Sequence, residues 1–324
     1  MTQERYCAET IVNAIEVNAV PAAPGAEGLK SRILELMRQA STEITVGDDA
    51  LLPALAAQLP AGSCVHVAHT PKASLEQVVH LSLAVQRAGL SACPHIVARR
   101  IVSLSALRSA LRELQRAGVG QILLVAGDLE KPLGDFASTL QILDSGVTID
   151  NGISVIGVAG HPEGHRAIDS EALWQALAHK QAFGERHGTA IHIVTQFSFN
   201  PDAIFAWERD LSAHGIRLPV RVGIAGPTPP LKLLQFAVRC GVATSLRTAA
   251  RTLSSLSSVS QLSTTPDQHL IALARAHDAG RSHQLVAPHF FAFGGTLKTA
   301  EWRHRLLQGD FHIDAEEGSV RPAG

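Results

Sequence analysis

The sequence lacks the patterns that mark several large classes of protein. Its four cysteines, Cys7, Cys64, Cys93 and Cys240, form neither a CxxC pair nor a cysteine–histidine metal spacing. We therefore expect buried, reduced thiols rather than a metal centre or a redox pair. No apolar run reaches the ~18 residues of a membrane-spanning helix, and the first residues lack a signal-peptide pattern. These absences lead us to expect a cytoplasmic protein that does not span a membrane.

A strong charge of one sign is missing as well. The formal net charge is −1, and no run of lysine or arginine is present. Nucleic acid and anionic membrane are therefore poor candidates for the main partner. Hydrophobic residues, in contrast, make up 46% of the 324 residues, enough for a large core. This length suits a single α/β barrel, which typically has ~250 residues and reaches ~400 with insertions.

Short apolar strands alternate with helical stretches along the chain. The expected strands cover residues 41–47, 64–69, 93–97, 121–126, 153–159, 190–196, 219–224 and 286–293. Apolar strands between helices indicate a parallel sheet, and eight such units predict a closed (β/α)8 TIM barrel. A doubly wound open sheet is the alternative, although no GxGxxG motif follows the early strands.

Several expected helices depend on signals at their ends. Ser170 is expected to cap a helix that runs through Phe183, and Asn200-Pro201 to begin the helix after the sixth strand. Residues 136–143 also have a helical pattern. Residues 231–256 are expected to be helical with a break at Gly241, and residues 257–266 to form a loop rich in serine and threonine.

The domain organisation follows from these elements. Residues 41–310 are expected to form one catalytic barrel, preceded by an N-terminal extension and helix over residues 1–40. Within that extension, residues 1–28 suit an arm, a lid or a contact to another subunit, so we expect a homo-oligomer or a partner protein. Residues 311–324 are expected to be a loosely ordered tail.

Polar residues gather where the expected strands end, which is where a barrel carries its active site. They are Glu43, His69, His95, Asp128, His161, Glu163, His165, Gln196 and His289. Glu43 faces either the barrel interior or solvent. In the interior, desolvation would raise its pKa and make it a proton donor. Asp128 either serves the site or caps the next helix. His161 and His165 are four residues apart on a loop rather than on a helix, so a zinc-protease motif does not fit, and we expect no metal.

Four segments together resemble the methylenetetrahydrofolate reductase family, and the resemblance extends from about residue 41 to 300. They are Cys93-Pro94-His95-Ile96, Leu124-Val125-Ala126-Gly127-Asp128, the stretch from Val158 to His165, and Val194-Thr195-Gln196-Phe197-Ser198-Phe199-Asn200. The resemblance implies a (β/α)8 barrel that binds FAD at its mouth. In that family NAD(P)H reduces the flavin and then leaves. 5,10-Methylenetetrahydrofolate takes the place of the nucleotide and is reduced to 5-methyltetrahydrofolate.

The resemblance also implies roles for individual residues. Glu43 would be the general acid that opens the five-membered ring of the folate, and Asp128 would contact the pterin and tune the flavin. Gln196 would contact folate and nicotinamide, with Phe197 and Phe199 of the same motif lining the substrate site. Cofactor contacts would come from His95, Ala126, Gly127, His161, His165 and Lys180.

The positions that hold the flavin depart from the family pattern more than the catalytic ones do. Ala126 replaces an arginine that helps to hold the FAD pyrophosphate, and His161 replaces the tyrosine beside the flavin. Leu173, Ala176 and His179 replace helix contacts to FAD, and only Lys180 is kept. Each missing charged contact typically costs ~1.5–3 kcal/mol. We therefore expect FAD to be held weakly, held differently or absent.

Three functions remain open at this point. The first is reduction of methylenetetrahydrofolate with NADH or NADPH, through a flavin or by direct hydride transfer. The second is a folate-binding or regulatory protein without redox chemistry. The third is a barrel enzyme that transfers a methyl group to or from a pterin or C1 unit.

Overall fold

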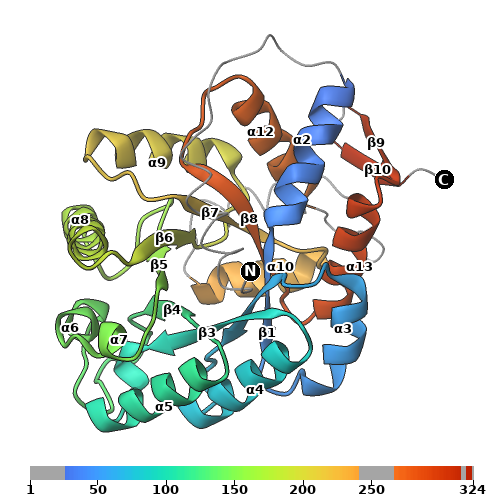
Figure 1. Ribbon diagram of the computed structural model, residues 1–324. Helices are drawn as coiled ribbons and strands as arrows, with labels where there is room; N and C mark the ends of the chain where they lie inside the picture. The colour runs from blue at the N-terminus through green and yellow to red at the C-terminus, as the bar shows by residue number, and fades with distance from the viewer. Residues whose placement is uncertain (1–25, 241–265, 315–318, 323–324) are drawn as a thin grey trace.

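Eight parallel strands form a closed barrel in the computed structural model, which describes residues 26–240, 266–314 and 319–322 (Figure 1). The strands are β1 (Ser41–Thr45), β2 (Cys64–Ala68), β3 (Ser91–Val97), β4 (Gln121–Val125), β5 (Val155–Gly160), β6 (Ala190–Thr195), β7 (Val220–Ala225) and β8 (Leu285–Phe291). Each strand pairs with the next one, and β8 pairs with β1. The predicted (β/α)8 barrel is confirmed, and the open sheet is wrong because β8 pairs with β1 and closes the eight-stranded sheet.

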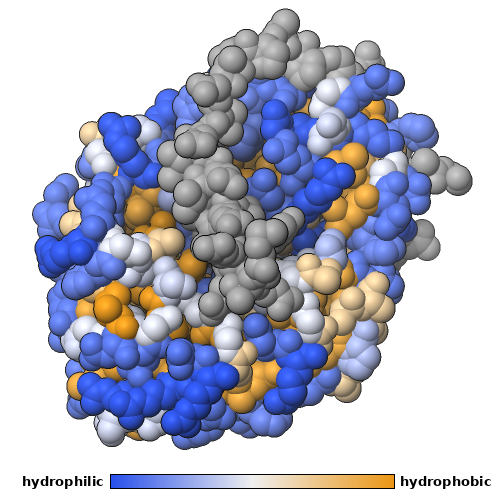
Figure 2. Space-filling view, viewed as in Figure 1, coloured by the Kyte–Doolittle hydropathy of each residue, from blue (hydrophilic) through white to orange (hydrophobic). Residues whose placement is uncertain are grey.

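Helices surround the barrel on its outside (Figure 1). They are α2 (Ala26–Gln39), α3 (Leu52–Gln58), α4 (Leu75–Arg87), α5 (Leu104–Arg116), α6 (Thr139–Asp144), α7 (Val147–Asp150), α8 (Ser170–His187), α9 (Pro201–Ala213), α10 (Pro230–Cys240), α12 (Asp267–Asp278) and α13 (Thr296–Leu307). Two 3-10 turns, η1 (Asp49–Leu51) and η2 (Ala98–Arg100), follow β1 and β3. None of the described helices is long and apolar enough to cross a bilayer. In the same view, hydrophilic residues cover much of the outer rim (Figure 2).

The alternation of side chains along each strand divides the interior into two regions. Ile44, Val65 and Ile122 point outward and belong to the main hydrophobic core between the strands and the helices. Their sequence neighbours therefore point into the barrel, because successive side chains of a strand face opposite sides. Some of those inward residues are apolar, such as Leu123 and Val194, which pack with two buried cysteines. The others are polar and form the candidate site.

Helix ends differ in detail from the sequence prediction. The cap of α8 is Asp169, whose side chain accepts a hydrogen bond from Ala172 N at 2.9 Å, so Ser170 is the first helical residue rather than the cap. The helix also continues past Phe183 to His187. α6 begins at Thr139, three residues after the predicted start, because Ser138 caps it. Asn200 caps α9 as predicted, accepting from Asp202 N at 3.1 Å.

The C-terminal residues form structure where a loose tail was expected. β9 (Phe311–Asp314) and β10 (Ser319–Pro322) pair as an antiparallel two-stranded sheet. Phe311 and Val320 are buried in the main core, and Val320 N donates a hydrogen bond to Asp267 of α12 at 3.1 Å. Burial of these two apolar side chains orders the segment. The expected arm over residues 1–28, apart from residues 26–28, and the helix and loop expected over residues 241–265 lie outside the described residues.

Two buried arginines hold the C-terminal end of α2 against the barrel. Arg303 Nε of α13 donates to Met37 O at 3.1 Å, and Arg221 Nη1 of β7 donates to Gln39 O at 2.7 Å. A helix C-terminus carries partial negative charge and unpaired carbonyls, so cationic donors stabilise it.

Replacing the buried arginine of α13 should therefore weaken the fold. We expect Arg303→Ala to lower the free energy of unfolding by about 3 kcal/mol, since it leaves a cavity and removes the hydrogen bonds to Met37 O and Ser63 Oγ. Urea denaturation measures this change. Arg305→Ala, an exposed position on the same helix, is the control and should change it by less than about 0.5 kcal/mol. Equal effects of the two variants would contradict this reading.

Candidate active site

Glu43 lies inside the barrel, which settles the choice between interior and solvent. On β1, Ser41 points inward because its Oγ is 2.9 Å from His289 Nδ1, and Glu43 is two residues further along the same face. The residue has intermediate exposure, but the surrounding protein raises the pKa of its carboxyl to about 8 through desolvation. Its carboxylate has no hydrogen-bond partner among the residues the structure describes. A neutral carboxyl of this kind is suited to donating a proton.

Four histidines share the barrel interior with Glu43: His66 of β2, His95 of β3, His192 of β6 and His289 of β8. The Nδ1 atom of His66 is 3.2 Å from Nε2 of His95, and the ring centroids of His66 and His289 are 4.4 Å apart. Burial lowers the pKa of His95 and His192 to about 3 and holds those of His66 and His289 well below the ordinary value. All four imidazoles are therefore neutral at physiological pH.

Several nitrogens of these histidines are buried without a partner among the described residues. They are Nε2 of His66, Nε2 of His289 and both ring nitrogens of His192. A buried polar atom without a hydrogen bond is costly and points to an ordered water or a functional role. Across the described part of the chain, no three histidine, cysteine or carboxylate side chains are arranged as ligands of one metal ion.

Asp128 follows β4 at the C-terminal end of the barrel, in a more open setting than Glu43. Its side chain is 68% exposed, and its Oδ1 is 3.2 Å from Nη2 of Arg100 on η2. Gly127 has φ +90°, and a Cβ there would lie 2.4 Å from Cγ1 of Val97, so glycine is required. Asp128 does not cap the following helix, since Ser138 does so ten residues later. The carboxylate is therefore exposed at the C-terminal end of the barrel, with Arg100 beside it.

The loop after β5 brings His161 and His165 together near Lys180 of α8. The two rings meet edge to face with centroids 5.0 Å apart. Burial, and then the neighbouring charges of His165 and Lys180, lower the pKa of His161 to about 4. Burial lowers the pKa of Lys180 to about 8. None of the described carboxylates lies within ion-pair distance of Lys180.

The segment after β6 carries a half-buried amide and an aromatic cluster. The side-chain oxygen of Gln196 accepts a hydrogen bond from Phe197 N at 3.1 Å. Phe197 is only 1% exposed and packs against Phe291 and Phe293 at the end of β8. Phe199 is half-buried and meets Phe197 edge to face. Phe197 and Phe199 therefore belong to one aromatic cluster at the ends of β6 and β8.

These residues do not fit a firmly held FAD. The pyrophosphate of FAD carries two negative charges and needs cationic donors. Arg99 is occupied by Ala137 O and Leu129 O, both at 2.8 Å, and Arg100 is paired with Asp128. Lys180 is the one remaining cation among the predicted cofactor contacts, and Ala126 supplies no charge. No catalytic step is therefore assigned to a flavin.

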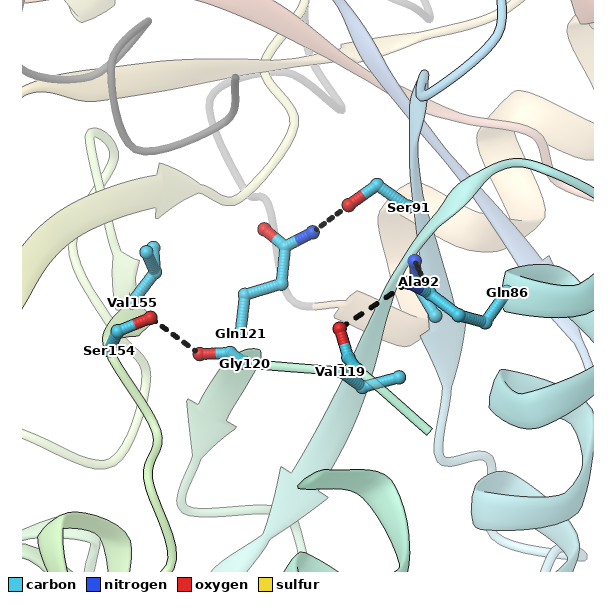
Figure 3. A pocket seen from close by; sticks show the side chains of 9 residues that line it. Gln86, Ser91, Ala92, Val119, Gly120, Gln121, Ser154 and Val155 are labelled. Carbon is cyan, nitrogen blue, oxygen red and sulfur yellow. Dashed lines mark hydrogen bonds between the residues drawn. The ribbon is translucent and has the colours of Figure 1, made fainter. Parts of the chain in front are cut away.

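Two hollows of the described structure lie away from this site. A small cavity lies at the opposite end of the barrel, where β3, β4 and β5 begin, and Figure 3 shows Gln121 bonded to Ser91 beside it. Its volume of about 10 Å³ is at the limit for one water molecule. A groove of about 330 Å³ lies outside the barrel between the end of β1 and α4. Its lining residues are Val46, Asp49, Glu76, Gln77 and His80.

Sequence reasoning considered strand ends and so missed polar residues within strands. His66, His192 and Arg221 were not named, although each occupies an inward position. Alternation in Cys64-Val65-His66-Val67 places His66 on one face with Cys64, and this pattern was the available signal. Arg100 was also missed, since only the folded loop brings it to Asp128.

Comparison with known proteins gives one family match and several distant structural similarities. The family model described as methylenetetrahydrofolate reductase matches residues 57–245, more than half of the chain. A mutant tryptophan synthase α-subunit from Pyrococcus furiosus is similar at 11% identity with a TM-score of 0.49, covering 84% of this chain and 98% of that one. Dihydropteroate synthase from Thermus thermophilus is similar at 12% identity with a TM-score of 0.43, covering 84% and 93%. Similarity at this level says nothing about chemistry, whereas the family match is specific. The chain belongs to the methylenetetrahydrofolate reductase family, a family of folate-related barrel enzymes.

Proposed function

We propose that this protein reduces 5,10-methylenetetrahydrofolate to 5-methyltetrahydrofolate, with hydride supplied directly by NADH or NADPH and Glu43 as the general acid. One observation carries the proposal. Glu43 lies on β1 of this barrel and faces its interior, and burial raises the pKa of its carboxyl to about 8. Such a group holds its proton at neutral pH and can release it to a bound substrate.

The proposed reaction begins with proton transfer. Glu43 donates its proton to the ring nitrogen that leaves, and the bond from that nitrogen to the methylene carbon breaks. The remaining nitrogen and the methylene carbon form a cationic iminium. Hydride from the nicotinamide then adds to this carbon, giving the methyl group and the oxidised nucleotide. The carboxylate of Asp128 stabilises the cation by its negative charge.

Residues at the barrel mouth supply the binding contacts in this proposal. Gln196 offers an amide at the end of β6, next to the aromatic cluster of Phe197 and Phe199. Asp128 offers an acceptor for donor groups of the pterin. His161 and His165 then form a largely uncharged surface on the β5 side, since burial disfavours the charged state of each, and Lys180 beside them keeps its charge at neutral pH because its pKa is about 8.

Direct hydride transfer is favoured over a flavin because most of the cations near the mouth are already bound to protein groups. Two of the three nearby cations, Arg99 and Arg100, are already engaged with protein groups. A dinucleotide that binds and leaves in each turnover does not need tight binding of its phosphates. A resident FAD does, because affinity for it depends on charged phosphate contacts.

A visible spectrum combined with a turnover assay tests the proposal. We expect purified protein to be colourless, without a flavin band, and to oxidise NADH or NADPH only when methylenetetrahydrofolate is present. A yellow protein whose bound flavin is reduced and reoxidised in turnover would replace direct transfer by the flavin route. A colourless protein that binds the folate without any turnover would overturn the enzyme assignment in favour of a binding or regulatory protein. Product analysis separates methyl transfer, which consumes no reduced nucleotide.

A further inference from the structure

Glu43 has to regain a proton after every turnover, which raises the question of its route. This question rests on the proposed function, because only a general acid loses its proton in each catalytic cycle. The substrate must lie over Glu43 to accept its proton, and it then covers whatever access from the mouth remains. A second path through the barrel interior would let Glu43 reload without waiting for the site to empty.

The register of the strands places such a path beside Glu43. Glu43 of β1 is the pairing partner of His66 on β2, so the two inward side chains are neighbours on strands ~4.8 Å apart. His66 in turn pairs with Cys93 of β3, which puts His95 one inward step nearer the C-terminal end. His95 is partly exposed, whereas His66 is fully buried. The pair therefore leads from the mouth side inward to Glu43.

The contact between the two rings has the geometry of a hydrogen bond that can carry a proton. His66 Nδ1 and His95 Nε2 are 3.2 Å apart, and the rings meet edge to face with centroids 5.4 Å apart. Both imidazoles are neutral, so each has one protonated and one free nitrogen. A neutral imidazole can accept a proton on one nitrogen while it releases another from the opposite nitrogen.

The second ring nitrogen of His66, Nε2, is the one that can serve Glu43. This atom is buried and has no partner among the described residues. Ser41 and His289 form a separate hydrogen-bonded pair one inward step deeper, and Ser41 occupies Nδ1 of His289. That deeper pair lies further from the mouth than Glu43 does, so it cannot be the entry side.

We propose that His95 and His66 form a proton relay that returns a proton from solvent to Glu43 after each turnover. Solvent protonates His95 on its free nitrogen, and His95 Nε2 passes its proton to Nδ1 of His66. His66 Nε2 then releases its proton to the Glu43 carboxylate through one bridging water molecule. One proton enters, one reaches Glu43, and both histidines return to neutrality with exchanged tautomers, which water-assisted tautomerisation resets before the next cycle. They act through Glu43 and are positioning residues.

The first test follows protonation of Glu43 without any turnover, in protein saturated with 5-methyltetrahydrofolate so that the mouth is covered. After a jump from about pH 9.5 to about pH 6.5, on either side of the raised pKa, infrared spectroscopy records the carbonyl band of protonated Glu43, identified by its loss in Glu43→Gln. We expect His95→Gln to slow the rise of this band by about tenfold, because glutamine keeps a hydrogen bond to His66 but cannot exchange tautomers. His192→Gln, an inward histidine outside the relay, is the matched control and should leave the rate unchanged.

Equal rates for the wild type and His95→Gln would overturn the relay. A loss of rate in His192→Gln of the same size would also overturn it, since the effect would then belong to the barrel interior as a whole. Thermal unfolding at pH 7 shows whether each variant is folded. If His95→Gln does not fold, His66→Asn, which keeps a group near Nδ1, takes its place.

The second test uses turnover. In His95→Gln the first turnover should proceed at the wild-type rate, because Glu43 is already protonated, and later turnovers should be about tenfold slower. A structural role would slow the first turnover as well, and that outcome would contradict the relay. Failure of the proposed function has a different signature: wild-type protein would show no reduction at all, while the infrared experiment would still report on the proton path.

Discussion

Glu43→Gln is expected to lower kcat for methylenetetrahydrofolate reduction by about 10²–10⁴-fold, the usual contribution of a general acid. Glutamine has nearly the same shape and can still fill the space on β1, but it has no proton to donate. Folate affinity should therefore change little. Steady-state kinetics and equilibrium titration with the folate measure the two effects separately. Glu76→Gln, an exposed carboxylate on α4, serves as the control and should retain full turnover.

The pH dependence gives this prediction a second readout. Glu43 acts in its protonated form, and its pKa is raised to about 8. The rate should therefore be constant at neutral pH and fall as pH rises through about 8. An unperturbed glutamate would lose activity near pH 4.5 instead. Unchanged turnover in Glu43→Gln, or a rate that stays level well above pH 8, would remove Glu43 from the mechanism.

The second large effect concerns stability in acid. His66, His192, His269 and His289 are buried, and burial lowers the pKa of each. In the unfolded chain each takes up a proton below about pH 6.5, whereas the folded protein resists it, so stability falls as pH drops below that value. Each of these histidines should lower the free energy of unfolding by about 2 kcal/mol at pH 5. Four such terms rival the total stability of an ordinary domain, about 5–15 kcal/mol.

Glu43 acts in the opposite direction. Its raised pKa keeps it protonated in the fold where the unfolded chain has lost the proton, so this group favours folding as pH falls from about 8 towards 4.5. One carboxyl does not offset four histidines. The net expectation is a sharp loss of stability between about pH 6.5 and pH 5.

Urea denaturation at several pH values measures this loss. His192→Leu tests its origin, because both ring nitrogens of His192 are buried and unpartnered among the described residues. This variant should be about 1–2 kcal/mol less sensitive to acid than the wild type between pH 7 and pH 5. His80→Leu, an exposed histidine on α4, should leave the pH dependence as it is. A wild-type protein that is equally stable at both pH values would refute the burial argument.

Prediction from the sequence succeeded where a local pattern is sufficient. Apolar strands separated by helical stretches are visible residue by residue, so all eight strands were located to within about two residues at either end. Helix ends were less accurate, since Asp169 and Ser170 are both good caps and only the backbone geometry chooses between them. The β9–β10 sheet was missed because Phe311 and Val320 are buried by contacts with distant parts of the chain.

The candidate site, too, could be predicted from the sequence only in part. The sequence by itself determined a (β/α)8 barrel with Glu43 on its first strand, because short-range periodicity and the order of the strands depend only on neighbouring residues. Tertiary structure alone decided that Glu43 faces inward, since the two faces of a strand are equivalent until the barrel closes. It also decided that His66 contacts His95 and lies next to Glu43 on the neighbouring strand. These residues are far apart in the chain, and the register between strands, which brings them together, is a property of the whole closed sheet.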